Sequence, residues 1–224
     1  MHAAYLTALL GAAIAAAAPS LESRAAPTPQ TVKFDDLRGV RGVVVNPVGP
    51  SGVYRDVFWP GFAPDETNIP GVPSGPIAGV LQRPGTQPIS LPNGIAWGTT
   101  NIQTVTTGPA AIDTKYAGSK VKYIDLKSFY LGCNSATKTS VTAVPASCRV
   151  AATCIRADGS KVGPQSFDFS VATGQLSAFP KKFEPKGFTQ CSRVKFDNPV
   201  STGALPVGAI LARLMDDVTL SAYR

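Results

Sequence analysis

One segment of this chain, residues 148–171, alternates apolar with polar or small residues on both sides of an Asp-Gly pair. The alternating positions are Cys148, Val150, Ala152 and Cys154 before Asp158-Gly159, and Phe167, Phe169 and Val171 after it. A period of two is typical of a half-buried β-strand, and Asp-Gly is a preferred hairpin turn. The segment therefore predicts a β-hairpin.

Other segments support the same fold class. Residues 120–133 and 187–198 alternate similarly, with Val194 and Phe196 facing one way and Arg193 and Lys195 the other. Residues 99–107 are rich in Thr, Ile and Val, and residues 46–92 are too dense in Gly and Pro for long helices. Residues 208–217 fit a short helical turn or a strand equally well. The sequence predicts an all-β sandwich.

The N-terminus predicts export from the cell. Residues 1–18 carry no Lys, Arg, Asp or Glu and end in Ala-x-Ala before Pro19, as secretory signal peptides do. The alternative is a membrane anchor, but the run is short and Ala-rich, and no later segment approaches spanning length. We expect a signal peptide over 1–18, a disordered leader over 19–30 and one domain over 31–224, secreted and without a membrane span.

The four cysteines are expected to form two disulfides. An even number of cysteines in an oxidising compartment is most simply explained by bridges, and four cysteines allow three pairings. We favour Cys133 with Cys148, which bracket a hairpin-like excursion, and Cys154 with Cys191, which ties a late strand back. Zinc binding is the alternative, but no Cys-x-x-Cys spacing occurs.

Four stretches carry a resemblance to known proteins: KFDDLRG, YIDLKSFYLGC, PASCRVAATCIRADG and LMDDVTLSAY. Together, over residues 31–224, they resemble a broad group of secreted fungal proteins of unknown activity. The resemblance implies a single jelly-roll-like or galactose-binding-like antiparallel β-sandwich. The segment VYRDVFWPGF departs from the group's usual Tyr-x-Gly-Phe-x-Trp order.

In such a fold the first and last strands lie side by side, which would bring two Asp-Asp pairs together. The pairs are Asp35, Asp36, Asp216 and Asp217, with Phe34, Leu37, Met215 and Val218 as the inward neighbours. Clustered carboxylates repel one another, so a structural Ca²⁺, backbone N–H groups, or Arg38 and Arg213 must compensate them. Alternatively, one Asp of each pair faces water and the other caps a turn. No other cofactor is expected.

The absence of histidine limits catalysis. The only histidine, His2, lies in the expected signal peptide, so the mature chain can form neither a Ser-His-Asp nor a Cys-His arrangement. Carboxylate, Tyr or Lys chemistry remains, as in glycoside hydrolases or polysaccharide lyases. Asp125, Asp158 and Asp168 are candidate catalytic carboxylates, but the presence of Asp158 is better explained by the hairpin turn that it begins. We assign no catalytic residue.

Aromatic residues in turn-rich sequence are candidates for carbohydrate binding. Tyr54, Trp59 and Trp97 could stack against sugar rings, with polar neighbours binding the hydroxyls. The alternative is that these side chains fill the core of the sandwich.

Charge suggests the type of partner. The formal net charge is +7, and residues 115–195 hold thirteen Lys or Arg against four Asp or Glu, an excess of nine. A basic face could bind anionic wall polysaccharide or phospholipid, or could simply be solvated. No nucleic-acid-binding motif occurs, so no nucleic-acid partner is expected.

These features together predict a secreted binding or interaction protein without catalytic activity. We expect a monomeric fungal effector, with a role in virulence, or a cell-wall-associated module that recognises a glycan or a host surface component. The alternative is a carbohydrate-active enzyme on the same fold.

Overall fold

The structure is a computed structural model that describes residues 27–37, 40–41, 52–66, 85–86, 88–90, 93–98, 108–137, 144–198, 200–205 and 209–224. The expected signal peptide, most of the leader, the segment 99–107 and Arg38 lie outside the described residues. The described residues contain no helix, and so none that is long and apolar enough to cross a membrane.

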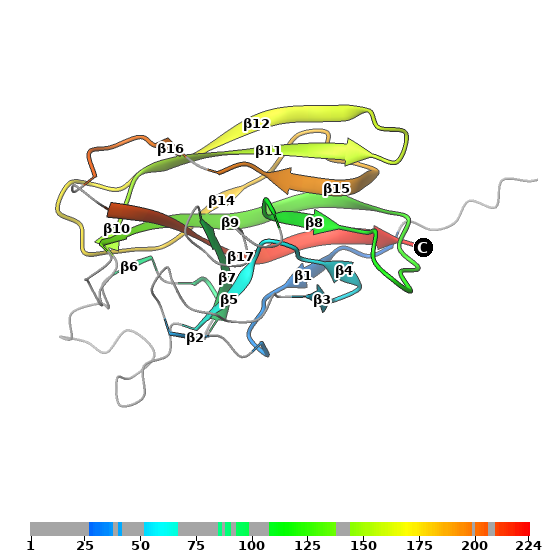
Figure 1. Ribbon diagram of the computed structural model, residues 1–224, viewed down its shortest axis with the longest axis horizontal. Coiled ribbons are helices and arrows are strands. Elements are labelled where there is room, and N and C mark those ends of the chain that lie inside the picture. The colour runs from blue at the N-terminus through cyan, green and yellow to red at the C-terminus, as the bar shows by residue number, and fades with distance from the viewer. Residues whose placement is uncertain are drawn as a thin grey trace, which may run out of the picture.

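Two long antiparallel strands form the centre of the fold. β9 (Tyr123–Thr137) and β17 (Ala209–Tyr223) each span 15 residues and pair along their whole length (Figure 1). The segment 208–217, which the sequence left open between helix and strand, is part of β17. Met215 on one face and Leu214 on the other are both buried, and a strand buried on both faces loses the alternation that identifies it.

The remaining strands extend this pair into a strongly curled, mainly antiparallel sheet. Beyond β17 lie β1 (Gln30–Val32), β7 (Asn93–Gly98), β5 (Ala63–Glu66) and β2 (Val40–Arg41). Beyond β9 lie β10 (Val144–Pro145), β14 (Lys181–Phe183), β15 (Cys191–Phe196), β8 (Ala111–Asp113), β4 (Val57–Phe58) and β3 (Val53–Tyr54). β11 (Cys148–Arg156) pairs with β15, β12 (Lys161–Phe169) and β16 (Val200–Ser201). In Figure 1, β11 and β12 lie on one side of β9 and β17, and β1, β5 and β7 lie on the other.

The predicted hairpin is confirmed. β11 and β12 pair from Cys148 with Phe169 to Ile155 with Lys161. The turn between them follows its sequence: Gly159 has φ +85°, and the Asp158 Oδ1 accepts the Ser160 N–H at 2.9 Å. The all-β, antiparallel class predicted from residue alternation is therefore correct.

Both predicted disulfides are present. Cys133–Cys148 joins β9 to the start of β11, and Cys154–Cys191 joins β11 to β15. No free cysteine remains. The four half-cystines are buried. Cys154–Cys191 cross-links two paired neighbouring strands, whereas Cys133–Cys148 joins β9 to β11, which are separated by β15 in the sheet.

A connected series of aromatic rings fills the core. Edge-to-face or tilted contacts with centroids 5.0–5.9 Å apart link the rings. In order they are Phe34, Trp59, Phe62, Trp97, Phe196, Phe129 and Phe167. These residues come from segments far apart in the sequence, so the core cannot form without the long-range pairing of the sheet.

The first and last strands lie side by side, as predicted. β1 pairs antiparallel with β17 from Gln30 with Leu220 to Val32 with Val218. Phe34, Met215 and Val218 are fully buried, and Leu37 packs against the core from a partly buried position.

A short second sheet covers the outer face of β9. β6 (Gly85–Thr86) pairs in parallel with β13 (Ser177–Ala178). The Thr86 hydroxyl donates to the Cys133 carbonyl at 3.0 Å, and the Thr86 N–H donates to the Asn134 side chain at 2.7 Å. Thr86 therefore lies directly over Gly132, where a Cβ would come within 2.2 Å of its Cγ2.

This contact gives the first prediction. Gly132→Ala should lower the free energy of unfolding by roughly 1–3 kcal/mol, because the buried, hydrogen-bonded Thr86 cannot move aside freely. Adding Thr86→Ser, which removes the clashing methyl group, should restore part of the loss in chemical denaturation. Gly203→Ala is the control, since its nearest neighbour would lie 3.7 Å away. Equal stability of Gly132→Ala and wild type would contradict this packing.

Candidate functional site

The two tryptophans proposed as ligand residues lie in the core. Trp59 and Trp97 have no exposed surface, and the Trp59 Nε1–H donates to the Tyr54 carbonyl at 3.0 Å. A sugar ring cannot stack against an indole whose faces are covered by other rings. Trp59 and Trp97 instead fill the core, which is the alternative interpretation of these aromatic residues.

Tyr54 and Asp36, expected in a ligand site and a metal site respectively, instead contact each other. The Tyr54 hydroxyl donates to Asp36 Oδ1, and the Arg55 guanidinium donates to Oδ2 at 3.2 Å. The hydrogen bond from Tyr54 lowers the pKa of Asp36, and burial raises the pKa of Tyr54. Arg55 and Asp56 form the two-residue β3–β4 turn, both with positive φ, as a type I′ hairpin requires.

The four aspartates do not form a metal centre. No group of three or more His, Cys, Asp or Glu suited to a metal ion occurs in the described part of the chain, which includes all four. Asp36 is exposed and binds Tyr54 and Arg55, whereas Asp216 is fully buried and binds Ser90. The Ca²⁺ hypothesis for Asp35, Asp36, Asp216 and Asp217 therefore gains no support from their arrangement.

Asp216 is held by hydrogen bonds to the segment that crosses it. Its Oδ2 accepts the Ser90 N–H at 2.8 Å, and its Oδ1 accepts the Asp217 N–H at 2.8 Å. The Ser90 hydroxyl lies 3.2–3.3 Å from both oxygens. Burial raises the pKa of Asp216 to about 7 despite these donors.

Arg213 does not compensate these carboxylates. Its Nη1 donates to the carbonyls of Leu211 at 3.0 Å and Trp97 at 3.3 Å, and its guanidinium lies 5.9 Å from the Trp97 ring centroid. It faces the aromatic core, whereas Asp216 faces the opposite side of β17. Burial lowers the pKa of Arg213 to about 9.

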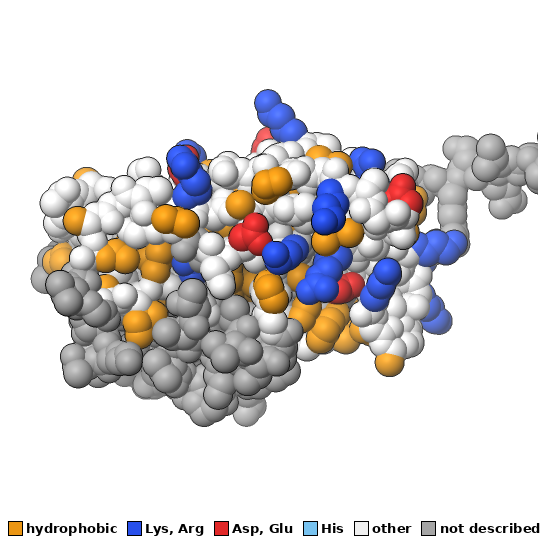
Figure 2. Space-filling model, turned by 45° about the horizontal axis from the view of Figure 1, so that its top comes forward, with side chains coloured by type: hydrophobic (Ala, Val, Ile, Leu, Met, Phe, Trp, Pro, Cys, Tyr) orange, Lys and Arg blue, Asp and Glu red, His pale blue; other side chains and the backbone are white. Residues whose placement is uncertain are grey.

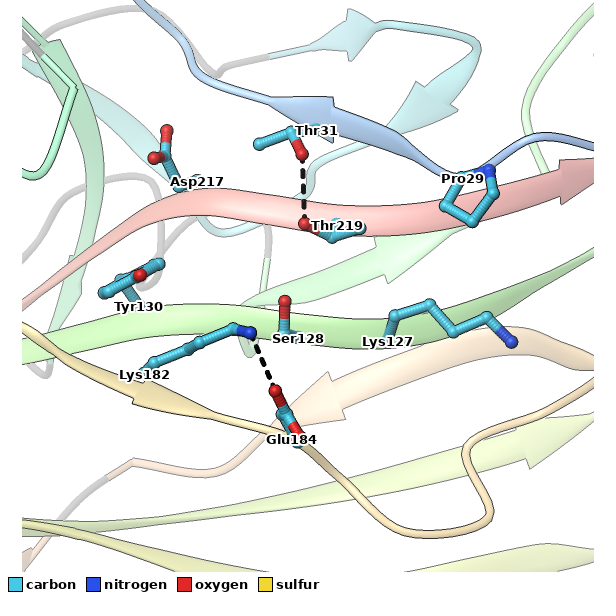
Figure 3. A pocket seen from close by; sticks show the side chains of 9 residues that line it. All are labelled: Pro29, Thr31, Lys127, Ser128, Tyr130, Lys182, Glu184, Asp217 and Thr219. Carbon is cyan, nitrogen blue, oxygen red and sulfur yellow. Dashed lines mark hydrogen bonds and ion pairs between the residues drawn. The ribbon is translucent and has the colours of Figure 1, made fainter.

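A groove lined mainly by polar residues lies on the outer face of the central strands (Figure 3). Its volume is about 560 Å³. The lining residues are Pro29 and Thr31 from β1 and its approach, Asp217 and Thr219 from β17, Lys127, Ser128 and Tyr130 from β9, and Lys182 and Glu184 from β14 and the residues after it. Thr31 and Thr219 lie on one side of the groove, and Lys182 and Glu184 lie on the other.

The groove forms where both central strands are irregular. Asp216 opposes Tyr130, Thr219 opposes Ser128 and Leu220 opposes Leu126, so the pairing register shifts twice within a few residues. Such bulges turn extra residues outward without interrupting the buried side. Two residues of β17, Asp217 and Val218, therefore stand opposite the single residue Phe129 of β9, and Lys127 of β9 is an extra residue on the other strand.

The cationic groups of the groove are already paired. The Lys182 Nζ lies 2.7 Å from Glu184, and the Lys127 Nζ lies 3.2 Å from Asp125. Asp125 also accepts hydrogen bonds from the Tyr223 hydroxyl at 3.1 Å and the Gln190 N–H at 2.9 Å. The hydrogen bond from Lys182 lowers the pKa of Glu184, so this carboxylate is ionised at neutral pH.

Asp217 provides an acceptor that the described residues do not use. Its Oδ1 is buried and accepts no hydrogen bond from a described residue. Its φ of +45° lies in the left-handed region, which Asp tolerates better than most residues. A buried acceptor without a donor is uncommon in proteins and requires an explanation.

Sequence reasoning did not identify this groove. Its signal is a break in alternation, because Lys127 and Ser128 are consecutive polar residues between the buried Leu126 and Phe129. The adjacency of β1 and β17 was predicted, but only the tertiary structure reveals that β9 and β14 complete the groove beside them.

Some of the basic residues are paired with acidic ones. Among the described residues, Lys127, Arg149, Lys182, Arg193 and Lys195, five of the thirteen cations counted in 115–195, pair with carboxylates. Figure 2 shows Asp and Glu side chains lying among the Lys and Arg side chains on the face that it presents.

Comparison with known proteins gives no further guidance. No protein-family model matches the chain, and no curated protein matches it.

The raised pKa of Asp216 gives the second prediction. Its ordinary value is 3.8, so between about pH 4 and 7 the folded protein holds a proton that the unfolded chain has released. The protonated Asp216 carboxyl therefore contributes fully to the free energy of unfolding below pH 4. This contribution is lost as pH rises to 7, at about 1.4 kcal/mol per pH unit. Asp216→Asn stays neutral, so its stability relative to wild type should increase across this range in denaturant titrations.

Asp36→Asn is the control for this measurement. Asp36 is exposed and its pKa is lowered, so its contribution is lost only as pH falls toward and below its ordinary value of 3.8. A pH-independent difference between Asp216→Asn and wild type from pH 4 to 7 would contradict the buried, protonated carboxyl.

Proposed function

We propose that this protein is a secreted, non-catalytic glycan-binding module whose ligand occupies the groove between β1, β17, β9 and β14. The observation that carries the proposal is a groove of about 560 Å³ lined by hydroxyl, ammonium and carboxylate groups, most of them on paired strands. Groups on strands are held more precisely than groups on loops, so the groove is preorganised for binding.

The chemistry of the groove suits a hydroxyl-rich ligand. Each sugar hydroxyl both donates and accepts, and the groove offers acceptors at Asp217 and Glu184 and donors at Lys127 and Lys182. The hydroxyls of Thr31 and Thr219 lie 3.1 Å apart and can do either. The half-buried Tyr130 supplies an aromatic side chain beside them.

Several features support binding rather than hydrolysis. A glycosidase needs a carboxylic acid with a raised pKa beside the scissile bond. In the groove, Lys182 lowers the pKa of Glu184. Asp216, a carboxyl whose pKa is raised, lies outside the groove lining and is fully buried and hydrogen-bonded to Ser90.

The proposed location rests on the disulfides and the resemblance. Two buried disulfides suit an oxidising compartment such as the cell exterior. The resemblance to secreted fungal β-sandwich proteins of unknown activity supports a ligand in a cell wall or on a host surface. A role as an effector is part of the same proposal.

Blocking the groove tests the proposal. Thr31→Trp, on the exposed edge strand β1, should project an indole into the groove and weaken glycan binding about tenfold or more, a loss of roughly 1.4 kcal/mol. Ser166→Trp, on the exposed edge strand β12, places the same side chain elsewhere and should bind like wild type. Isothermal titration calorimetry with ligands identified on a glycan array provides the measurement.

Two results would overturn the proposed function. Wild-type protein that binds no glycan on the array, or binds one equally well after Thr31→Trp, would reject the groove as the site. New reducing ends or unsaturated uronates during incubation would indicate an enzyme instead.

A further inference from the structure

We propose that the groove selects neutral oligosaccharides over anionic ones, although the whole chain is strongly basic. This inference rests on the proposed function and names the class of glycan that the groove accepts. It follows from how the charges in the groove are already paired, from the carboxylate of Asp217 that lines it and from the distance at which other charges act.

The lysines of the groove are not available as free cations. Lys182 is paired with Glu184, and Lys127 with Asp125, which is itself only slightly exposed. A uronate or sulfate group would have to compete with these carboxylates for the ammonium groups. Binding to these half-exposed ammonium groups would exchange one carboxylate partner for another, so it would add little net attraction.

Asp217 adds a negative charge that none of the described lysines pairs with. Its carboxylate lines the groove and can accept a hydrogen bond from a donor such as a sugar hydroxyl, but not from a carboxylate or sulfate oxygen. Like charges in a partly buried site repel, so an anionic sugar placed here would be disfavoured. A neutral sugar supplies the donor without the repulsion.

The net charge of +7 does not reverse this preference. Exposed charges more than about 8 Å apart are largely screened at physiological ionic strength. The remaining basic residues therefore act mainly on long-range encounter, and the groove's own groups decide which ligand stays bound. Non-specific attraction to polyanions should accordingly disappear in salt.

The test measures the binding of two glycan panels by calorimetry at about 150 mM salt, a concentration chosen near the physiological value. The neutral panel consists of cello-, chito-, manno- and β-1,3-gluco-oligosaccharides, and the anionic panel of oligogalacturonates and heparin oligosaccharides. Wild type should bind at least one neutral ligand about tenfold or more tightly than any anionic one, as loss of one charge-assisted hydrogen bond would produce.

Two variants connect the preference to named groups. Asp217→Asn keeps a residue that tolerates positive φ and should weaken the best neutral ligand about tenfold, because a charged acceptor is lost. Glu184→Gln, at an exposed position, releases Lys182 and should increase oligogalacturonate binding severalfold. Circular dichroism and thermal unfolding should show that both variants remain folded.

The outcomes separate this inference from the proposed function. If anionic ligands bind wild type as tightly as neutral ones and bind the Thr31→Trp variant more weakly, the neutral preference is overturned and the groove remains the binding site. Unchanged neutral binding in folded Asp217→Asn would also overturn the inference. Binding of neither panel would overturn both.

Discussion

The antiparallel pairing of β9 with β17 is the constraint on which the rest of the structure depends. Every other part of the main sheet attaches to one of these strands directly or through a neighbour. Their inner faces carry the apolar residues of the core. Thr86 and Ser90, from other segments, bind to their outer faces, which also form part of the groove. Because the pair joins residues 72 to 100 positions apart, from Ala209 with Thr137 to Tyr223 with Tyr123, long-range contacts dominate this fold.

The double irregularity in this pair connects the fold to the proposed site. A regular pair would place single polar residues in alternation on the outer face. The register shifts instead turn Asp217 outward from β17 and Lys127 outward from β9, while Val218 and Leu126 remain buried. The same backbone feature therefore preserves the core and creates the groove, as bulges near functional sites often do.

The aromatic content and net charge of the chain do not predict which groups line the groove. With aromatics at 8% of the residues, the core uses both tryptophans, which leaves Tyr130 as the aromatic side chain among the described groove residues. The overall charge of +7 is similarly uninformative about the groove, where lysines face carboxylates at 2.7 and 3.2 Å. Local pairing, rather than composition, governs what can bind there.

The sequence by itself determined the all-β class and the hairpin at Asp158-Gly159, favoured the disulfide pairing that the structure shows, and predicted the adjacency of the two terminal strands. These features follow from local periodicity, turn chemistry and cysteine number, and from the fold that the resemblance implied. The tertiary structure alone decided that Trp59 and Trp97 are buried, that Asp36 binds Tyr54 while Asp216 binds Ser90, and that Thr31, Ser128 and Lys182 line one groove. The physical reason is that burial and proximity depend on pairing register between distant strands, where a shift of one residue moves a side chain to the opposite face.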